Sequence, residues 1–251
     1  MSERHERPGG WLFHQGKAVD EPLDFSTALP GEPPLFLHLV FTLDGAYVPA
    51  VVRKPAGEGP FPAVMCLHGG SGGLGFSFLA DQMRNRGWLF ERLLGEGYLV
   101  CHTEGRMERE EAYGTEFPGV LDHQDVIEVF RYLRRLPEVD ADRIGTFGVS
   151  HGGELQMKLI AEIGSGPAAM VPTEPAVIEF LGLKHEATSD EGWAIEDSSG
   201  PRVEEKLQFR GPVSDDEIDF SRAMERIQRI SPSVPIMVLG RDDDHLQGLF
   251  K

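Results

Sequence analysis

Short apolar runs in the first part of the chain predict β-strands. Residues 35–43 (LFLHLVFTL) and 46–54 (AYVPAVVRK) flank Asp44-Gly45, and an Asp-Gly pair between two such runs is a strong signal for a β-hairpin. Residues 61–67 (FPAVMCL) form a continuous apolar run, which suits a strand buried on both faces of a parallel sheet. The pattern therefore predicts an N-terminal antiparallel hairpin that leads into a parallel sheet.

Helical and strand patterns alternate along the rest of the chain. In residues 122–136, apolar side chains recur at the i, i+3, i+4 and i+7 spacing that gives a helix one apolar face. The helical stretches are 86–95, 122–136, 151–163 and 215–230, and the strand runs are 98–102, 143–149, 168–171 and 234–240. Strands that alternate with helices predict an α/β fold, in which a mostly parallel sheet has helices on both faces.

The length of 251 residues fits one α/β domain better than two small ones. Residues 1–34 are rich in proline, glycine and charge, and we expect an irregular N-terminal segment there. Residues 35–251 would form the α/β domain. Within this domain, residues 184–217 are polar and broken by glycine and proline, which fits either an inserted cap or a disordered surface loop.

Charge and composition narrow the classes of partner. The formal net charge of -17 disfavours nucleic acid and anionic membranes, whose phosphates would repel the surface. No stretch reaches the roughly 18 apolar residues of a membrane span. The two cysteines, Cys66 and Cys101, each lie in an apolar run, as buried thiols do in a reducing compartment. We therefore predict a cytoplasmic protein that binds neither nucleic acid nor membrane.

A nucleophile motif stands where a predicted strand meets a predicted helix. Gly148-Val149-Ser150-His151-Gly152 matches the G-x-S-x-G elbow, in which a strand turns abruptly into a helix and exposes the serine oxygen. A second match, Gly69-Gly70-Ser71-Gly72-Gly73, lies among glycines that start a helix only at a cost. Because only Ser150 follows a strand and opens a helix of good helix formers, we predict Ser150 rather than Ser71 as the nucleophile.

The glycine-rich loop after residues 61–67 has a different predicted role. Backbone N–H groups of Gly69 and Gly70, together with the N–H of His151, would hold the oxyanion of a tetrahedral intermediate. We expect His68 to fix this loop by hydrogen bonding rather than to act as a base. The alternative for the loop is a flexible turn without such a role.

A catalytic acid is expected after residues 234–240, because the sites of open α/β sheets gather at the carboxyl ends of the strands. Asp242, Asp243 and Asp244 stand there, and a buried carboxylate among them would orient an imidazole and stabilise its charged form. A solvated acidic turn is the alternative. Their position alone does not show which of the three aspartates would be the catalytic acid.

Together these motifs resemble the dienelactone hydrolase and prolyl oligopeptidase-like branch of the α/β hydrolases. The segments that carry the resemblance are FPAVMCLHGG, VDADRIGTFGVSHGG and VPIMVLGRDDDHLQ, and it extends over residues 35–250. The resemblance implies the α/β-hydrolase fold and a serine hydrolase of carboxylic esters, lactones or peptides that needs no cofactor and no metal. A small-molecule ester would be its substrate. Asp243, three residues after Gly240, would be the acid.

The end of the printed sequence departs from that family. The family order is Ser, then Asp, then a His on a loop after one further strand, whereas Lys251 follows Asp243 by only eight residues. The last strand, the His loop and the closing helix would be missing, so we expect a truncated chain with weak or no activity. The histidines that could substitute are His102, His123 and His245.

Two other functions fit the same residues. A binding module with the α/β-hydrolase fold would keep the pocket and dispense with the triad, and an exopeptidase or amidase would differ from the esterase only in its substrate. A missing closing strand would also leave Val234–Leu239 as an exposed apolar edge. Since such edges pair with other chains, self-association through this segment is expected.

Overall fold

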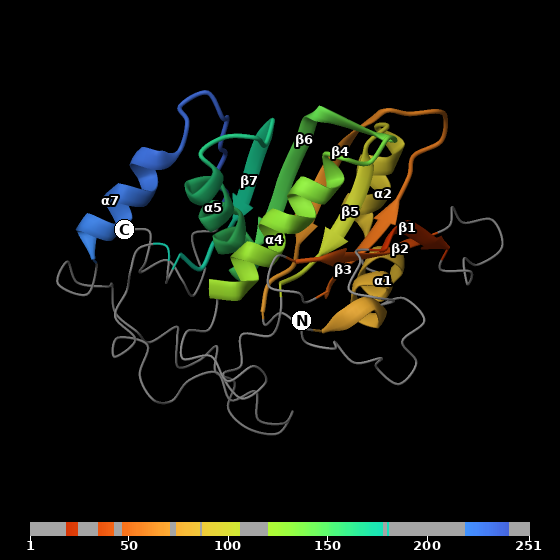
Figure 1. Cartoon of the computed structure of the whole chain (residues 1–251), viewed down its shortest axis with the longest axis horizontal. Helices are drawn as coiled ribbons and strands as arrows, with labels where there is room; N and C mark the ends of the chain where they lie inside the picture. Colours follow the sequence, from red (N-terminus) through yellow and green to blue (C-terminus); the bar gives the residue numbers. More distant parts are fainter. Residues whose placement is uncertain are drawn as a thin grey trace, which may run out of the picture.

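The described part of the chain is built around a seven-stranded sheet (Figure 1). The computed structural model describes residues 19–24, 35–42, 47–70, 74–85, 87–105, 120–177, 180 and 219–240. The strands are β1 (Val19–Asp24), β2 (Phe36–Phe41), β3 (Tyr47–Arg53), β4 (Phe61–Leu67), β5 (Leu99–Thr103), β6 (Val139–Val149) and β7 (Ala169–Thr173). Their order across the sheet is β1-β2-β3-β5-β4-β6-β7.

The sheet joins an antiparallel part to a parallel part. The strands β1, β2, β3 and β5 pair antiparallel in turn, whereas β5, β4, β6 and β7 pair parallel. The predicted hairpin is therefore β2 with β3, and the predicted parallel strands are β4 to β7. In the parallel part, Leu67 is level with Thr103 on one side and with Gly148 on the other. The carboxyl ends of these strands thus meet at one edge of the sheet.

Helices cover both faces of the sheet, as the alternating pattern predicted (Figure 1). The helices are α1 (Gly75–Asn85) and α2 (Trp88–Gly95) on one face, α4 (Val120–Leu133) and α5 (His151–Ile163) on the other, and α7 (Phe220–Arg229) beside α5. The buried side chains of Met65, Phe130 and Leu159 lie in the core under α4 and α5, and those of Leu79 and Met83 lie in the core under α1. Burial of a large apolar side chain stabilises the fold by about 1.5–3 kcal/mol.

One strand lies in the segment that the sequence predicted to be irregular. Residues Val19–Asp24 form β1 and pair with β2, with a shift of register between Val19 and Leu23. The strand is at the edge of the sheet. An edge strand tolerates a proline such as Pro22, because one side of its backbone needs no partner strand. The prediction of an irregular segment at residues 1–34 is therefore wrong for the six residues of β1.

The sequence predicts a full strand at 234–240, whereas the structure has two isolated parallel bridges to β7 there. The bridges are at Ile236 and Leu239. The backbone of residues 235–239 still forms hydrogen bonds with β7 and with the residue that follows it. Pro235 has no N–H and therefore cannot donate a hydrogen bond to a neighbouring strand. The side chain of Val238 is exposed, as are those of its two neighbours. Self-association through this apolar edge stays a prediction.

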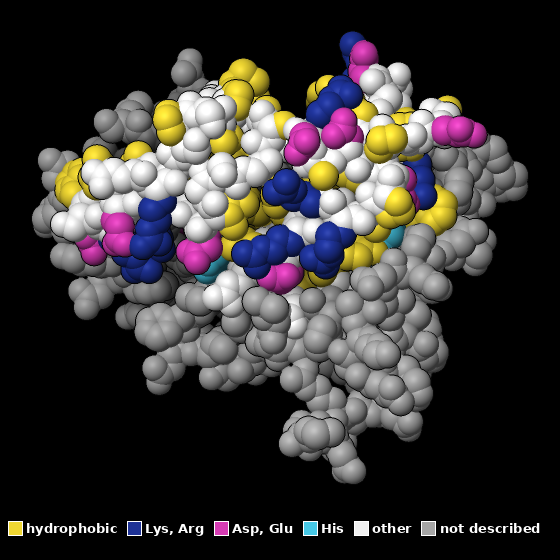
Figure 2. Space-filling model, turned by 45° about the horizontal axis from the view of Figure 1, so that its top comes forward, with side chains coloured by type: hydrophobic (Ala, Val, Ile, Leu, Met, Phe, Trp, Pro, Cys, Tyr) yellow, Lys and Arg dark blue, Asp and Glu magenta, His cyan; other side chains and the backbone are white. Residues whose placement is uncertain are grey.

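Charged side chains of both signs lie beside one another on the face that Figure 2 shows. Ion pairs of this kind join Arg131 to Glu128 at 2.6 Å and Arg143 to Asp140 at 4.0 Å. Such exposed pairs contribute only about 0.2–1 kcal/mol each, so they add little to the stability of the fold.

Several predictions from the sequence fall on residues that the structure does not describe. These are the inserted cap or disordered loop at 184–217 and the course of residues 241–251, on which the expectation of a missing strand, His loop and helix depends. Of the helices in the described ranges, none combines the length and the apolar character needed to cross a membrane.

Candidate active site

Ser150 stands on a sharp turn between β6 and α5. Its backbone has φ 53° and ψ -118°, and a positive φ is costly for a residue other than glycine. The Ser150 N–H donates to the carbonyl of Thr173 at 2.9 Å, and the Ala176 N–H donates to the carbonyl of Ser150 at 3.1 Å. A strained serine between the end of a parallel strand and the start of a helix has the geometry of a nucleophile elbow.

At the two glycines of the motif, the neighbouring backbone leaves no room for a side chain. A Cβ built on Gly148 would lie 2.3 Å from the carbonyl oxygen of Gly152, and a Cβ built on Gly152 would lie 2.5 Å from the carbonyl oxygen of His68. Both clashes are with backbone atoms, which cannot move away by a change of rotamer as the end of a long side chain can. Gly148 and Gly152 therefore allow the start of α5 to approach the ends of β6 and β4.

A buried glutamine fixes the helix of the elbow to the sheet. Thr146 Oγ1 donates to Gln156 Oε1 at 2.7 Å, and Gln156 Nε2 lies 3.4 Å from the carbonyl of Gly148 and 3.3 Å from that of Val171. Gln156 is fully buried on α5. Because its amide contacts both β6 and β7, it helps to set the distance between the helix and the strand that carries Ser150.

The glycine-rich loop after β4 lies against Ser150. A Cβ built on Gly69 would lie 3.0 Å from the Cβ of Ser150. Gly70 has φ 81°, in the left-handed region that favours glycine. His151 is the first residue of α5, where backbone N–H groups have no acceptor within the helix and the helix dipole is positive. The structure brings Ser150, Gly69 and His151 together, and their roles in an oxyanion hole stay predictions.

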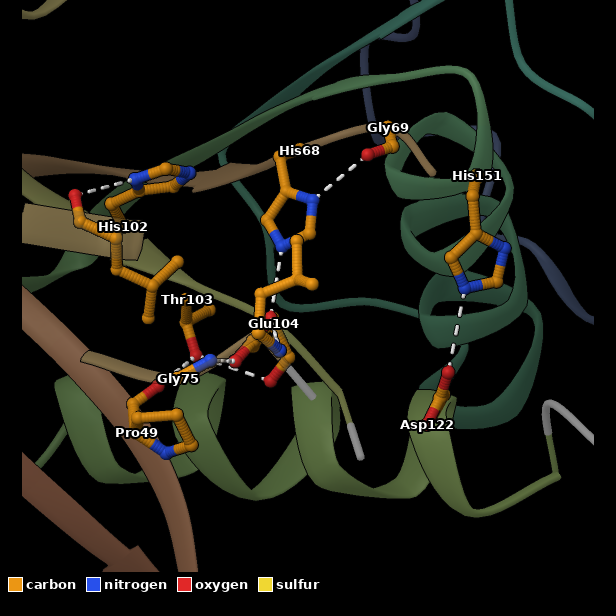
Figure 3. Close-up of polar contacts among 11 residues, drawn as sticks. Pro49, His68, Gly69, Gly75, His102, Thr103, Glu104, Asp122 and His151 are labelled. Carbon is orange, nitrogen blue, oxygen red and sulfur yellow. Dashed lines mark hydrogen bonds and ion pairs between the residues drawn. The ribbon is translucent and has the colours of Figure 1, made fainter. Parts of the chain in front are cut away.

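His68 links this loop to a buried carboxylate that the sequence analysis did not single out (Figure 3). His68 Nδ1 donates to the carbonyl of Gly69 at 2.9 Å, and His68 Nε2 lies 3.0 Å from Oε2 of Glu104. The Glu104 carboxylate also accepts the backbone N–H groups of Leu74 at 2.9 Å and Gly75 at 2.5 Å. Glu104 directly follows β5, and a charged residue at the carboxyl end of a parallel strand was the signal that could have revealed it.

The side chain of His151 faces α4 rather than the loop (Figure 3). Its Nε2 lies 3.5 Å from Oδ2 of Asp122, and its Nδ1 lies 4.0 Å from Oε2 of Glu154. Both acidic residues are buried. Asp122 was not predicted as a site residue from the sequence, because an acidic residue is common in the first turn of a helix. The ring of His151 thus lies against two carboxylates, and the role of its backbone N–H stays a prediction.

A small hollow lies between the ends of β4 and β5 and the start of α5. Its lining residues are Leu67, His68, Thr103, Glu104, Gly105, His151 and Leu155. The hollow therefore lies beside Glu104 and the two histidines, and the surface that lines it is largely apolar. Within the described ranges, no three His, Cys, Asp or Glu side chains are grouped so that they could hold a metal ion.

The predicted acid lies outside the described residues. The same holds for its neighbours and for two alternatives, namely Asp242, Asp243, Asp244, His245 and Ser71. Leu239 bridges to Thr173, whose carbonyl accepts the N–H of Ser150. The chain therefore reaches the edge of the sheet that carries Ser150 just before the aspartates, and Asp243 as the acid stays a prediction.

Two of the histidines considered as substitutes for a missing base, His102 and His123, lie in the described residues. His102 is buried, its ring lies 5.1 Å from that of Phe90, and its Nδ1 lies 3.3 Å from the carbonyl of Leu79. Burial, with the nearby His68, lowers the pKa of His102 from 6.5 to about 4. These contacts are those of a neutral core histidine. His123 is half-buried on α4.

The stability of the fold should fall as the pH is lowered from about 6.5 to about 4. Burial lowers the pKa of both His38 and His102 from 6.5 to about 4. The unfolded chain therefore binds protons in this range that the folded chain does not, and each imidazole costs up to about 1.4 kcal/mol per pH unit. Urea unfolding at a series of pH values gives the unfolding free energy as a function of pH. We expect this free energy to fall less steeply between about pH 6.5 and about pH 4 in a His102→Phe variant than in the wild type. An equal fall in both proteins would contradict the burial of a neutral His102.

Neither cysteine competes with Ser150 as a nucleophile. Burial raises the pKa of the Cys66 thiol to about 12, and burial together with Cys66 raises the pKa of the Cys101 thiol further. Since the thiolate is the reactive form, both thiols are inert at neutral pH. Ser150 as the nucleophile stays a prediction, with neither buried thiol as an alternative.

Two curated relatives from Bacillus subtilis are similar to the chain in sequence. The uncharacterized peptidase YuxL is 26% identical over 187 residues, which cover 68% of this chain and 26% of the relative. The uncharacterized peptidase YtmA is 27% identical over 133 residues, which cover 53% of this chain and 48% of the relative. The chain thus spans about a quarter of the length of the first and about half of the second. No family model matches the chain.

Solved esterase structures share the fold. Acetyl xylan esterase 1 from Thermoanaerobacterium has a TM-score of 0.54 and 16% identity, with 89% of this chain and 81% of that chain covered. A hyperthermophilic esterase from Pyrobaculum calidifontis has a TM-score of 0.52 and 19% identity, with 86% of this chain and 70% of that chain covered. The chain has the α/β-hydrolase fold, and the prediction of that fold is confirmed.

Proposed function

We propose that the chain is a serine hydrolase that acts on carboxylic esters through an acyl-enzyme on Ser150. The observation that carries the proposal is the backbone of Ser150, which is strained at φ 53° with Gly69 packed against it. Such strain persists where surrounding contacts hold it, and it gathers at functional sites. The names of the esterases with this fold support esters as the substrate class.

In the proposed reaction, Ser150 Oγ attacks the ester carbonyl carbon while a general base takes the hydroxyl proton. The carbonyl oxygen becomes an oxyanion, which the N–H groups of His151 and of Gly69 or Gly70 would stabilise. As this intermediate collapses, the base returns the proton to the departing alcohol and the acyl group stays on Ser150. The same base then takes a proton from the water that attacks the acyl group and releases the acid. Asp243 is the proposed carboxylate that orients the base. The reaction needs no cofactor.

The curated relatives favour a second substrate class. Both are named peptidases. Peptide and ester hydrolysis use the same kind of nucleophile and oxyanion hole, and they differ in the leaving group, since an amine must be protonated before it departs. An exopeptidase or amidase of the same fold is therefore the alternative to the esterase.

Two chromogenic substrates separate these functions. p-Nitrophenyl acetate tests the esterase, alanine p-nitroanilide tests the peptidase, and a Ser150→Ala variant gives the blank for each. We expect the larger rate enhancement over buffer for the ester. A larger enhancement for the anilide would place the chain among peptidases. Rates equal to the blank for both substrates, with no acyl group on the protein, would favour a non-catalytic binding module.

A further inference from the structure

Glu104 contacts both ends of the glycine-rich loop between β4 and α1. It accepts the N–H groups of Leu74 and Gly75 where α1 begins, and it contacts His68 where β4 ends. Its side chain is 1% exposed, so a carboxylate there depends on these partners for its stability. The N-terminus of α1 also favours a negative charge. One side chain thus joins the two ends of the segment that carries Gly69 and Gly70.

The ring of His68 carries this contact to the loop backbone. The carbonyl of Gly69 can only accept, so His68 Nδ1 carries the proton of that 2.9 Å hydrogen bond. His68 Nε2 lies 3.0 Å from Oε2 of Glu104, within hydrogen-bond distance. Both ring nitrogens are therefore engaged, and the ring is held in one orientation. The ring of Phe78 packs against it in a T-shaped arrangement, with 4.8 Å between the ring centroids.

The hydrogen bond to Gly69 also fixes the direction of a neighbouring N–H group. The carbonyl of Gly69 and the N–H of Gly70 belong to one peptide unit, which is planar and trans, so the two groups point in opposite directions. Holding the carbonyl toward His68 sets where the Gly70 N–H points. Without that bond, a glycine-rich segment has many backbone conformations of similar energy.

We propose that Glu104 is a positioning residue for the oxyanion hole, acting through His68 on the peptide unit between Gly69 and Gly70. The proposal rests on the proposed reaction at Ser150, because an oxyanion forms only there. Glu104 does not touch the substrate in this proposal. Its carboxylate orients the imidazole, and the imidazole orients the donor.

The test uses the full chain and a fluorophosphonate probe that labels reactive serines. Glu104→Gln keeps the shape of the side chain and removes its charge, and His68→Phe keeps a ring against Phe78 and removes both hydrogen bonds. We expect each variant to label about 10- to 100-fold more slowly, since a lost oxyanion-hole donor typically costs about 10²–10³. Because the two residues act in one chain of contacts, the double variant should label no more slowly than the slower single variant.

Glu138→Gln is the matched control. Glu138 is a partly buried carboxylate paired with Lys54 at 2.6 Å, and it directly precedes β6, at the opposite end of that strand from Ser150. This variant should label at the wild-type rate. Thermal melting checks that each variant is folded. If Glu104→Gln does not fold, His68→Phe decides the case, because it leaves in place the hydrogen bonds from Leu74 and Gly75 to Glu104. Wild-type labelling rates in folded Glu104→Gln or His68→Phe would overturn the proposal.

Hydrogen exchange separates this proposal from the reaction it rests on. Leu74 and Gly75 donate directly to Glu104, so their amides should exchange at least about tenfold faster in Glu104→Gln. If the wild type is not labelled, the proposed reaction fails, and faster exchange in the variant would still support Glu104 as the residue that fixes the loop. Unchanged exchange of both amides would overturn that role, whatever the result of labelling.

Discussion

A Gly148→Ala variant should lose about 2–3 kcal/mol of unfolding free energy, together with its reactivity at Ser150, through one added methyl group. The new Cβ would lie 2.3 Å from the carbonyl oxygen of Gly152 and 2.8 Å from Nε2 of Gln156. The first contact is with backbone at the start of α5, so the helix has to move away from β6. The turn that holds Ser150 moves with it. Urea unfolding measures the first loss, and fluorophosphonate labelling measures the second.

Gly145→Ala in the same strand is the control for this substitution. A Cβ on Gly145 would lie 3.4 Å from the carbonyl oxygen of Ala169, which is an ordinary contact. Its unfolding free energy should stay within about 0.5 kcal/mol of the wild type, and its labelling should not change. Equal stability of the Gly148 and Gly145 variants would show that close packing at the elbow is not required.

The parallel half of the fold was predictable because its strands are buried on both faces. Such strands read as continuous apolar runs, and residues 61–67 coincide with β4. The elbow was also predictable, since the strand signal before Ser150 and the helix formers after it lie next to each other in sequence. The close approaches at Gly148 and Gly152 then follow from packing that the motif already implies.

What the sequence did not reveal depends on partners that are distant along the chain. The strand β1 has no apolar run and exists because β2 offers it a free edge. The helix α1 begins at Gly75 after a run of glycines, which are poor helix formers, and its first N–H group is satisfied by Glu104. The contact between His151 and Asp122 likewise joins two helices. Such contacts leave no local pattern.

Ser150→Ala should abolish the chemistry and keep the fold. Removal of the nucleophile of a serine hydrolase typically lowers turnover by about 10⁶. The substitution keeps the Cβ, so the strain of the turn and the contact with Gly69 remain as they are, and the unfolding free energy should stay within about 0.5 kcal/mol of the wild type. Ser71→Ala, in the other G-x-S-x-G match, should leave the reaction unaltered.

The most direct measurement is fluorophosphonate labelling followed by peptide mapping in a mass spectrometer. If Ser150 is the nucleophile, the wild type and Ser71→Ala carry a single adduct on the peptide that contains Ser150, and Ser150→Ala carries none. An adduct on any other residue, or equal labelling of wild type and Ser150→Ala, would contradict the assignment of Ser150 as the nucleophile.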